Sequence, residues 1–336
     1  MELGTDAKRK RARRIRAVVS FVVMVAALVA LTFIASNTGT LKVAPDQLVR
    51  GLFFEYDQNV STIFDLRFPR IVISLLAGAA IATSGVLFQA VLKNPLADPG
   101  IIGISSGASF ASVLVVAFLP LLYFYTPLFA CLGGVVAFAL VYGLSWKGGL
   151  SPLRIILVGV AVNALFTGLS SAFGAAGAGS GVASIVNGNI TMKTWTDVGT
   201  LAPYTAVGLI LALVCVHACN MLQLEDRTAR GLGVNVNRSR LLVSFVAVIL
   251  ASISTAVVGP ISFLGLIVPH IGRILVGSDH KALVPFTMLF GAFLFLLADT
   301  VGRTIMVPNE ISAAIVMSVI GGPFFIVLLR GSKRYG

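Results

Sequence analysis

The sequence predicts an all-α protein that crosses a membrane about ten times. Of its 336 residues, 57% are hydrophobic and only 11% are charged, whereas a soluble domain carries about a quarter charged residues. Runs of about 20 apolar residues, the length that spans the core of a bilayer, recur along the whole chain. Together these observations leave no room for a separate soluble domain.

Ten spans follow from the apolar runs and the polar breaks between them. They cover residues 15–36, 63–91, 101–119, 121–145, 152–173, 200–222, 240–258, 262–277, 283–301 and 311–330. The chain then divides into a basic segment over 1–14, a transmembrane domain over 15–330 and a short tail over 331–336. The first apolar run is too long for a cleaved signal peptide and lacks a small-residue cleavage site, so we expect it to remain as a span.

The formal charge of +12 is distributed unevenly along the chain. The densest basic cluster, Lys8–Arg14, directly precedes the first span, which is typical of a cytoplasmic anchor and not of a nucleic-acid site. With that end inside, ten spans return the other terminus to the cytoplasm. All but six of the 25 Lys and Arg residues then lie on the cytoplasmic side, as the positive-inside rule requires. We therefore expect a multi-pass protein of the cytoplasmic membrane with both termini inside and lipid around it.

Three connections between spans have unusual compositions. Residues 93–100 contain two prolines and a glycine, which force a sharp turn. Residues 174–189 are rich in Gly, Ala and Ser without charge, so we expect a short helix or a re-entrant segment. Residues 225–234 carry charges of both signs and predict a short surface helix closed by glycine.

The breaks at 94–107 and 259–272 occupy comparable positions in two sets of four spans. One set would start outside the membrane and the other inside, so the two sets could be inverted repeats. Paired breaks of this kind often mark a transport path in transporters built from repeats.

Several kinds of chemistry are missing from the sequence. It has no Gly-x-x-x-x-Gly-Lys-[Ser/Thr] motif, so ATP and Mg²⁺ would have to be bound by a partner. The three cysteines and the isolated histidines do not form a metal site, and no nucleophile–base set indicates an enzyme. No ionisable residue lies at the centre of a span, which disfavours an ion-coupled secondary transporter; that alternative stays open, because backbone carbonyls can also coordinate sodium. We expect no metal and no cofactor in the chain itself.

Arginines at the expected outer ends of spans run against the charge bias. Arg67 and Arg70 are three residues apart and share one helix face, and Arg303 lies at the outer end of the ninth span. Such a cluster could receive an acidic partner or an anionic ligand. The alternatives are contacts with lipid headgroups, or a local pair between Asp299 and Arg303 at i, i+4.

An ordered set of sequence strings covers nearly the whole chain. The strings are Leu66–Arg70, Gly78–Gly85 with Gln89, Asn94–Pro99, Ile102–Ala108, Ala229–Val234, Gly259–Leu266, Pro269–Arg273 and Gly321–Phe325. In this order they resemble the BtuC/FecCD-type permeases of type II ABC importers for siderophores, haem and cobalamin. One departure is Leu224, at a position where members of the family often have glycine.

The resemblance implies a transporter made of this chain, a second permease copy or a paralogue, two cytoplasmic ABC ATPases and an extracytoplasmic substrate-binding protein. It implies that Arg67, Arg70 and Arg303 meet acidic residues of the binding protein. It also implies an ATPase-coupling segment made of Glu225, Asp226, Arg227, Ala229, Arg230, Gly231, Leu232 and Gly233.

We expect alternating access along a path between the two permeases, lined mainly by spans five, eight and ten and by residues 174–189. The candidate path and gate residues are Gln89, Asn94, Pro95, Ser105, Ser106, Gly107, Gly174, Gly177 and Gly179. Of the possible ligands, the sequence favours a ferric siderophore, followed by haem and then cobalamin.

Overall fold

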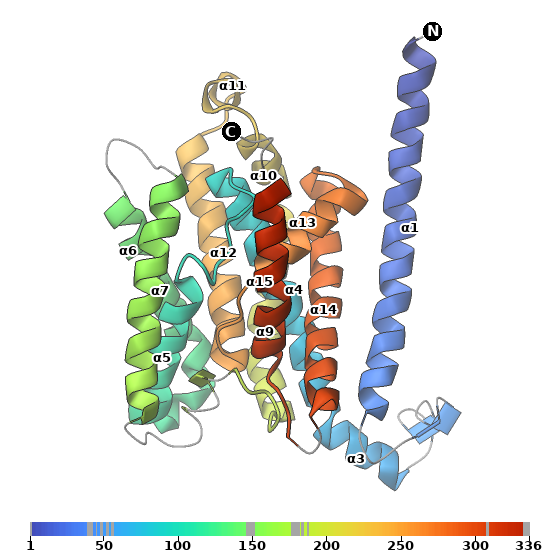
Figure 1. The fold of residues 1–336 in the computed structure, drawn as a ribbon, viewed down its shortest axis with the longest axis vertical. Helices are drawn as coiled ribbons and strands as arrows, with labels where there is room; N and C mark the ends of the chain where they lie inside the picture. Colours follow the sequence, from blue (N-terminus) through green and yellow to red (C-terminus); the bar gives the residue numbers. More distant parts are fainter. Residues whose placement is uncertain are drawn as a thin grey trace.

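The computed structural model describes residues 2–38, 43–44, 46–47, 50–51, 54, 57–145, 152–175, 182, 185–186, 188–306 and 309–331. Within these residues the regular structure is entirely helical (Figure 1). The helices are α1 (Glu2–Asn37), α3 (Gln58–Leu66), α4 (Phe68–Leu92), α5 (Ile104–Phe118), the 3₁₀ helix η1 (Pro120–Tyr125), α6 (Thr126–Ser145), α7 (Pro152–Ala175), α9 (Trp195–Val214), α10 (Val216–Leu222), α11 (Asp226–Gly231), α12 (Val236–Val258), α13 (Leu264–Val276), α14 (His280–Ile305) and α15 (Ala313–Gly331).

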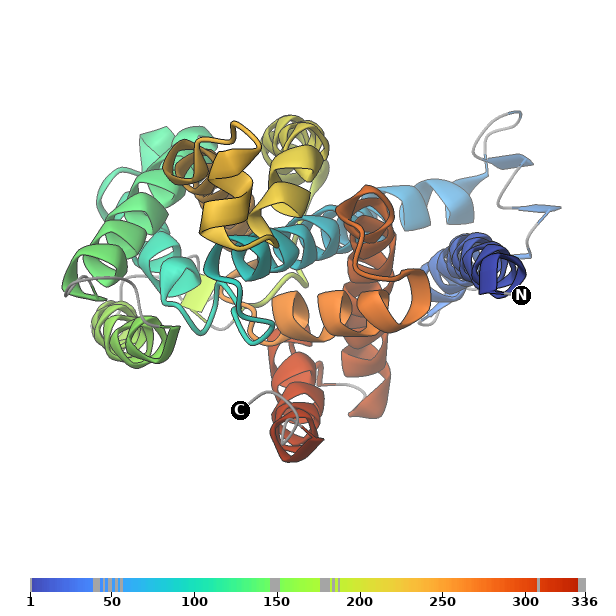
Figure 2. The ribbon, with the colours of Figure 1, turned by 90° about the horizontal axis from the view of Figure 1, so that it is seen from above.

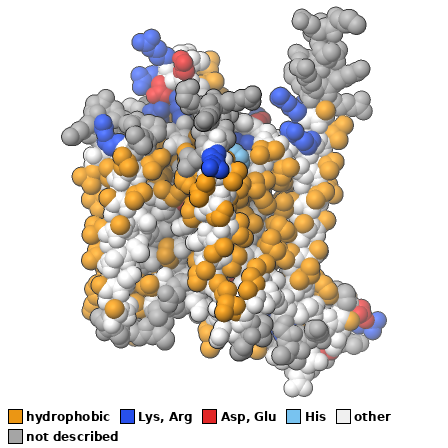
Figure 3. Space-filling view, in the orientation of Figure 1, with side chains coloured by type: hydrophobic (Ala, Val, Ile, Leu, Met, Phe, Trp, Pro, Cys, Tyr) orange, Lys and Arg blue, Asp and Glu red, His pale blue; other side chains and the backbone are white. Residues whose placement is uncertain are grey.

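The expected spans all have helical counterparts. Seven helical segments are long and apolar enough to cross a membrane, and three shorter apolar helices lie in α5, α13 and α15. Hydrophobic side chains cover the middle of the visible face, and charged side chains gather toward its two ends (Figure 3). This distribution is that of an integral membrane protein solvated by lipid around its waist.

Boundaries differ from the expectation at three places. The second span is divided at Arg67, because Pro69 lacks an N–H donor and starts the new helix α4 in its first turn. The sixth is divided at Cys215 into α9 and α10. The basic segment 1–14 is not separate from the first span, since α1 already begins at Glu2; Lys, Arg and Ala are good helix formers and continue the helix.

Helix α4 lies at the centre of the bundle and is buried along most of its length. It packs against α14 through Gly78 and Gly291, and against α13 through Gly85 and Gly265. A β-carbon added at Gly78 would overlap the Gly291 carbonyl oxygen, and one added at Gly85 would overlap that of Gly265. Small residues allow membrane helices to approach this closely. The glycines therefore set the distance between α4 and its neighbours.

The two breaks that the sequence paired meet beside α4. The Gln89 Nε2 atom donates to the Ala97 carbonyl at 3.3 Å and to the Gly265 carbonyl at 3.2 Å, joining both breaks to one side chain. Gly103 and Phe263, with φ of 88° and 67°, directly precede the short helices α5 and α13. The irregular backbone is thus enclosed by protein, as it must be in a membrane-spanning chain.

The bundle has two chemically different ends. The start of α1, the helix α11 and the end of α15 lie at one end, called the α11 end, and α3 lies at the other, called the α3 end (Figure 1). Seen from above, α15 and α12 lie on opposite sides of the bundle (Figure 2). The elements expected to be cytoplasmic therefore share one end.

A methyl group at Gly85 tests the close packing of α4. Because its β-carbon would overlap the Gly265 backbone, we expect Gly85→Ala to lower the free energy of unfolding by about 1–3 kcal/mol. Gly143→Ala on α6 is the control, since a β-carbon there meets nothing within 4 Å. The thermal unfolding midpoint of the purified chain in detergent should fall for Gly85→Ala alone. Equal midpoints for both variants would contradict this account.

Candidate functional site

Three arginines singled out in the sequence lie at the α3 end, where two carboxylates neutralise part of their charge. Arg67 and Arg70 lie on either side of the start of α4, and Arg303 is in the last turn of α14. Asp299 lies one turn before Arg303, and Glu310 follows in the connection to α15. The cluster joins segments about 230 residues apart in the sequence, as its hydrogen bonds show.

Arg70 is the centre of this cluster. Its Nη2 and Nε atoms donate to Asp299 Oδ1 at 2.8 and 3.0 Å, and its Nη1 donates to Glu310 Oε2 at 2.7 Å. Arg70 is 5% exposed and Asp299 is fully buried. The paired fork geometry is the strong form of an arginine–carboxylate contact. In this conformation Arg70 is therefore directed into the protein.

The other two arginines bond the end of α1. Arg67 Nη1 donates to the Ser36 carbonyl at 2.6 Å, and Arg303 Nη2 donates to the Ala35 carbonyl at 3.2 Å. Arg303 Nε also lies 3.6 Å from Asp299 Oδ2, so the local i, i+4 pair considered from the sequence is present. Arg67 is half-buried, and the side chain of Arg303 is 7% exposed. Docking on these arginines stays a prediction.

Glu310 extends the cluster toward a cavity. Its Oε2 atom accepts a second hydrogen bond, from Thr191 Oγ1 at 2.8 Å. Burial acts to raise the pKa of Glu310, but the hydrogen bond and charge of Arg70 outweigh it, so the pKa lies below its usual value. A carboxylate held ionised in this way keeps both partners. Glu310 was not among the residues predicted from the sequence. Its position in the connection that follows Arg303 is the sequence feature that could have identified it.

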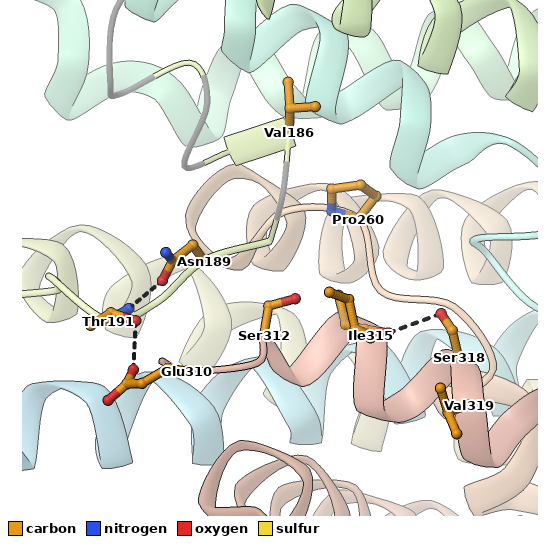
Figure 4. Close-up of a pocket in the computed structure, with 10 residues that line it drawn as sticks. Val186, Asn189, Thr191, Pro260, Glu310, Ser312, Ile315, Ser318 and Val319 are labelled. Carbon is orange, nitrogen blue, oxygen red and sulfur yellow. Dashed lines mark hydrogen bonds between the residues drawn. The ribbon is translucent and has the colours of Figure 1, made fainter. Parts of the chain in front are cut away.

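The cavity beside Glu310 has a volume of about 650 Å³ (Figure 4). Asn189, Thr191 and Glu310 lie at one end of it, and Ser312 and Ser318 of the α15 segment lie along its side. Its lining comes from the end of the 174–189 stretch, from Pro260 in the second break and from α15. Three of the elements expected beside a path thus line one cavity of mixed polarity at the α3 end.

The candidate path residues that the structure describes do not line the cavity beside Glu310. Gln89, Asn94 and Pro95 line a second cavity of about 230 Å³ at the α11 end. Ser105 and Ser106 are buried at the start of α5. Gly107 packs against Gly133 of α6, where an added β-carbon would have no room.

The remaining candidates belong to the glycine-rich stretch. Gly174 lies in the last turn of α7, and an added β-carbon there would meet nothing within 4 Å. Gly177 and Gly179 fall outside the described residues.

The segment expected to couple to an ATPase forms α11 and its cap. Gly233 has φ of 82°, its N–H donates to Arg230 O at 2.9 Å, and the Val234 N–H donates to Ala229 O at 3.1 Å. These two bonds form a Schellman motif, which ends a helix at a glycine. Ala229 is buried beneath, and Leu232 is 65% exposed. The helix therefore buries Ala229 against the bundle and exposes both polar and apolar side chains on its outer face.

Most residues of the expected coupling segment are exposed on the surface. Those with more than about a third of their surface exposed are Glu225, Arg227, Arg230, Gly231, Leu232 and Gly233.

Asp226 anchors this helix to the bundle. One oxygen, Oδ1, accepts from Lys93 Nζ at 2.8 Å and from Arg240 Nη2 at 2.9 Å. The hydrogen bond from Lys93, together with the charge of Arg240, lowers the pKa of Asp226. Lys93 also donates to the Leu224 carbonyl at 2.6 Å. Asp226 thus links α11 to the C-terminal end of α4 and to the first turns of α12.

Comparisons with known proteins point to one family. The FecCD transport family matches residues 27–331. The chain is 41% identical over 314 residues to the "Probable heme-iron transport system permease protein IsdF" of Staphylococcus aureus strains MSSA476 and Newman, covering 94% of this chain and 96% of each relative.

Solved structures agree with this result. The structure titled "An inward-facing conformation of a putative metal-chelate type ABC transporter" superposes with a TM-score of 0.78 and 31% identity, over 93% of this chain and 99% of that one. PsaBC from Streptococcus pneumoniae, in complex with a Fab, shares the fold with a TM-score of 0.58 and 17% identity, over 84% of this chain and 95% of that one. The protein is a member of the FecCD transport family, the integral-membrane permease subunits of ABC importers.

Proposed function

We propose that this permease imports an iron chelate across the cytoplasmic membrane, and that haem is the first ligand to test. The observation that carries the ligand class is the 41% identity, over nearly the full length, to permeases named for haem-iron transport. The sequence strings alone favoured a ferric siderophore, which remains the second candidate within the same family. The chain would pair with a second permease, and two ATPases would supply ATP hydrolysis because family permeases are not enzymes themselves.

The α3 end is proposed to face outside and to receive the binding protein. Its cluster contains three arginines and two carboxylates, so one positive charge remains for acidic side chains of a partner. Glu310 belongs to both the cluster and the cavity lining. A partner's carboxylates would approach the half-buried Arg67 at the edge of this cluster, because Arg70 is buried and directed into the protein. Docking would in this way place the partner beside the cavity that Glu310 lines.

The α11 end is proposed to face the cytoplasm and to bind the ATPases. Arg230 and Leu232 are exposed on the coupling segment, while Asp226 ties that segment to Lys93 and Arg240. A tether of this kind would transmit ATPase movement to α4 and α12. These two helices lead into the breaks that meet at Gly265.

Ligand-stimulated ATP hydrolysis tests the function. The complex is reconstituted with its binding protein and ATPase and is presented with haem, a ferric siderophore or cobalamin. We expect one iron chelate to stimulate hydrolysis, and only with the binding protein present. Arg230→Ala combined with Leu232→Ala should keep basal hydrolysis and lose the stimulation, whereas Arg238→Ala should keep both. An assembled, active ATPase that no ligand stimulates would overturn the iron-chelate assignment.

Charge reversal at Arg67 tests the docking surface. We expect Arg67→Glu to weaken binding-protein affinity about tenfold or more, because it places like charges opposite each other. Arg238→Glu, the same charge change at the α11 end, should leave this affinity unaltered. Arg70→Glu is unsuitable, since it would bury a carboxylate beside Asp299 and destabilise the fold. Equal affinities of wild type and Arg67→Glu, measured by surface plasmon resonance, would refute docking at Arg67.

A further inference from the structure

A groove at the α11 end lies between α6 and α12 and is separate from the candidate path. Its volume is about 760 Å³, which is in the range of sites for small organic ligands. Val135 and Phe138 of α6 and Leu241 and Phe245 of α12 contribute apolar walls. Leu241 is 67% exposed and Phe245 54%. Since α12 lies across the bundle from α15 (Figure 2), the groove is on the side away from the cavity beside Glu310.

The α11 end of this groove is basic. Lys93 and Arg240 both line it, and they share a single carboxylate oxygen of Asp226. Two cations facing one anion leave a net charge of +1. In addition, the buried Nε atom of Arg240 has no hydrogen-bond partner among the described residues. The rim therefore has capacity for another anionic oxygen.

An amphiphilic ligand would match both the apolar walls and the basic rim of this groove. Exposed Leu and Phe side chains in a membrane-spanning segment are covered by acyl chains, whereas a soluble anion would leave the apolar walls unused. Basic pockets between membrane-spanning helices bind anionic lipid headgroups. A zwitterionic lipid would bring a cationic group next to Lys93 and Arg240, which costs interaction energy. Charge and shape thus favour a lipid with a net negative headgroup.

We propose that this groove is a binding site for an anionic phospholipid, with the phosphate at Lys93 and Arg240 and an acyl chain against Phe138 and Phe245. The phosphate shares its two cations with Asp226, the first residue of α11. Bound lipid therefore changes how firmly the coupling segment is tethered. Only this consequence for coupling rests on the proposed function; lipid binding is independent of what the protein transports.

Native mass spectrometry of the purified full-length chain tests the site. The chain is titrated with phosphatidylglycerol or phosphatidylcholine of identical acyl chains. We expect the wild type to prefer phosphatidylglycerol, and Arg240→Gln to reduce this preference about fivefold, the effect of one basic residue at a membrane surface. Arg238→Gln removes the same charge from an exposed position two residues away, outside the groove lining, and should keep the preference.

A second variant separates the groove from general surface charge. Ala139 is an exposed residue of the groove wall, so Ala139→Trp should fill the groove and lower phosphatidylglycerol binding while both cations remain. Excess inorganic phosphate should displace little lipid. Equal binding of the two lipids by the wild type, or an unchanged preference in both Arg240→Gln and Ala139→Trp, would overturn the proposal. Displacement by inorganic phosphate alone would show that the apolar walls are not used.

Discussion

The close approach of α4 to its neighbours is the constraint on which the rest of the structure depends. Gly78 and Gly85 bring its backbone against Gly291 of α14 and Gly265 of α13, without space for a methyl group. Ser84 adds a hydrogen bond from its Oγ to the Ala247 carbonyl of α12 at 2.7 Å. Helices in lipid gain little from the hydrophobic effect, so such packing and hydrogen bonding provide the association energy. Because Arg70 lies in the first turn of α4 and Lys93 is its C-cap, this packing positions both charged ends.

The two ends use charge in different ways. At the α3 end, Arg70 is enclosed with Asp299, and a buried pair of this kind contributes little net stability but is costly to break. Its second contact is to the partly exposed Glu310, which also lines the cavity. At the α11 end, Asp226 holds two half-exposed cations, which solvent and lipid phosphate can reach. One end is therefore a largely buried charge cluster, and the other is an adjustable tether.

Much of the fold was predictable because it follows from composition and local sequence. The ten spans come from apolar length, the cap of α11 from Gly233 and the breaks from Pro and Gly. The candidate site was predicted less completely. Arg67, Arg70 and Arg303 stood out by charge, but their pairing with Asp299 and Glu310 spans long sequence distances. Gly107 stays a predicted path residue, and its close contact with Gly133 of α6 is one that only packing reveals.

The sequence by itself determined that this protein is helical and spans a membrane, with a basic end and a mixed-charge surface helix, because those properties depend on residue types and their spacing. That it is a permease came from the resemblance of its ordered sequence strings to one family. Only the tertiary structure decided which arginine is buried, which acid joins the charged cluster to the cavity, and where Lys93 and Arg240 meet above an apolar groove. These features arise from helices that are distant in sequence and adjacent in space. Their geometry is set by interhelical packing, which no local pattern of residues encodes.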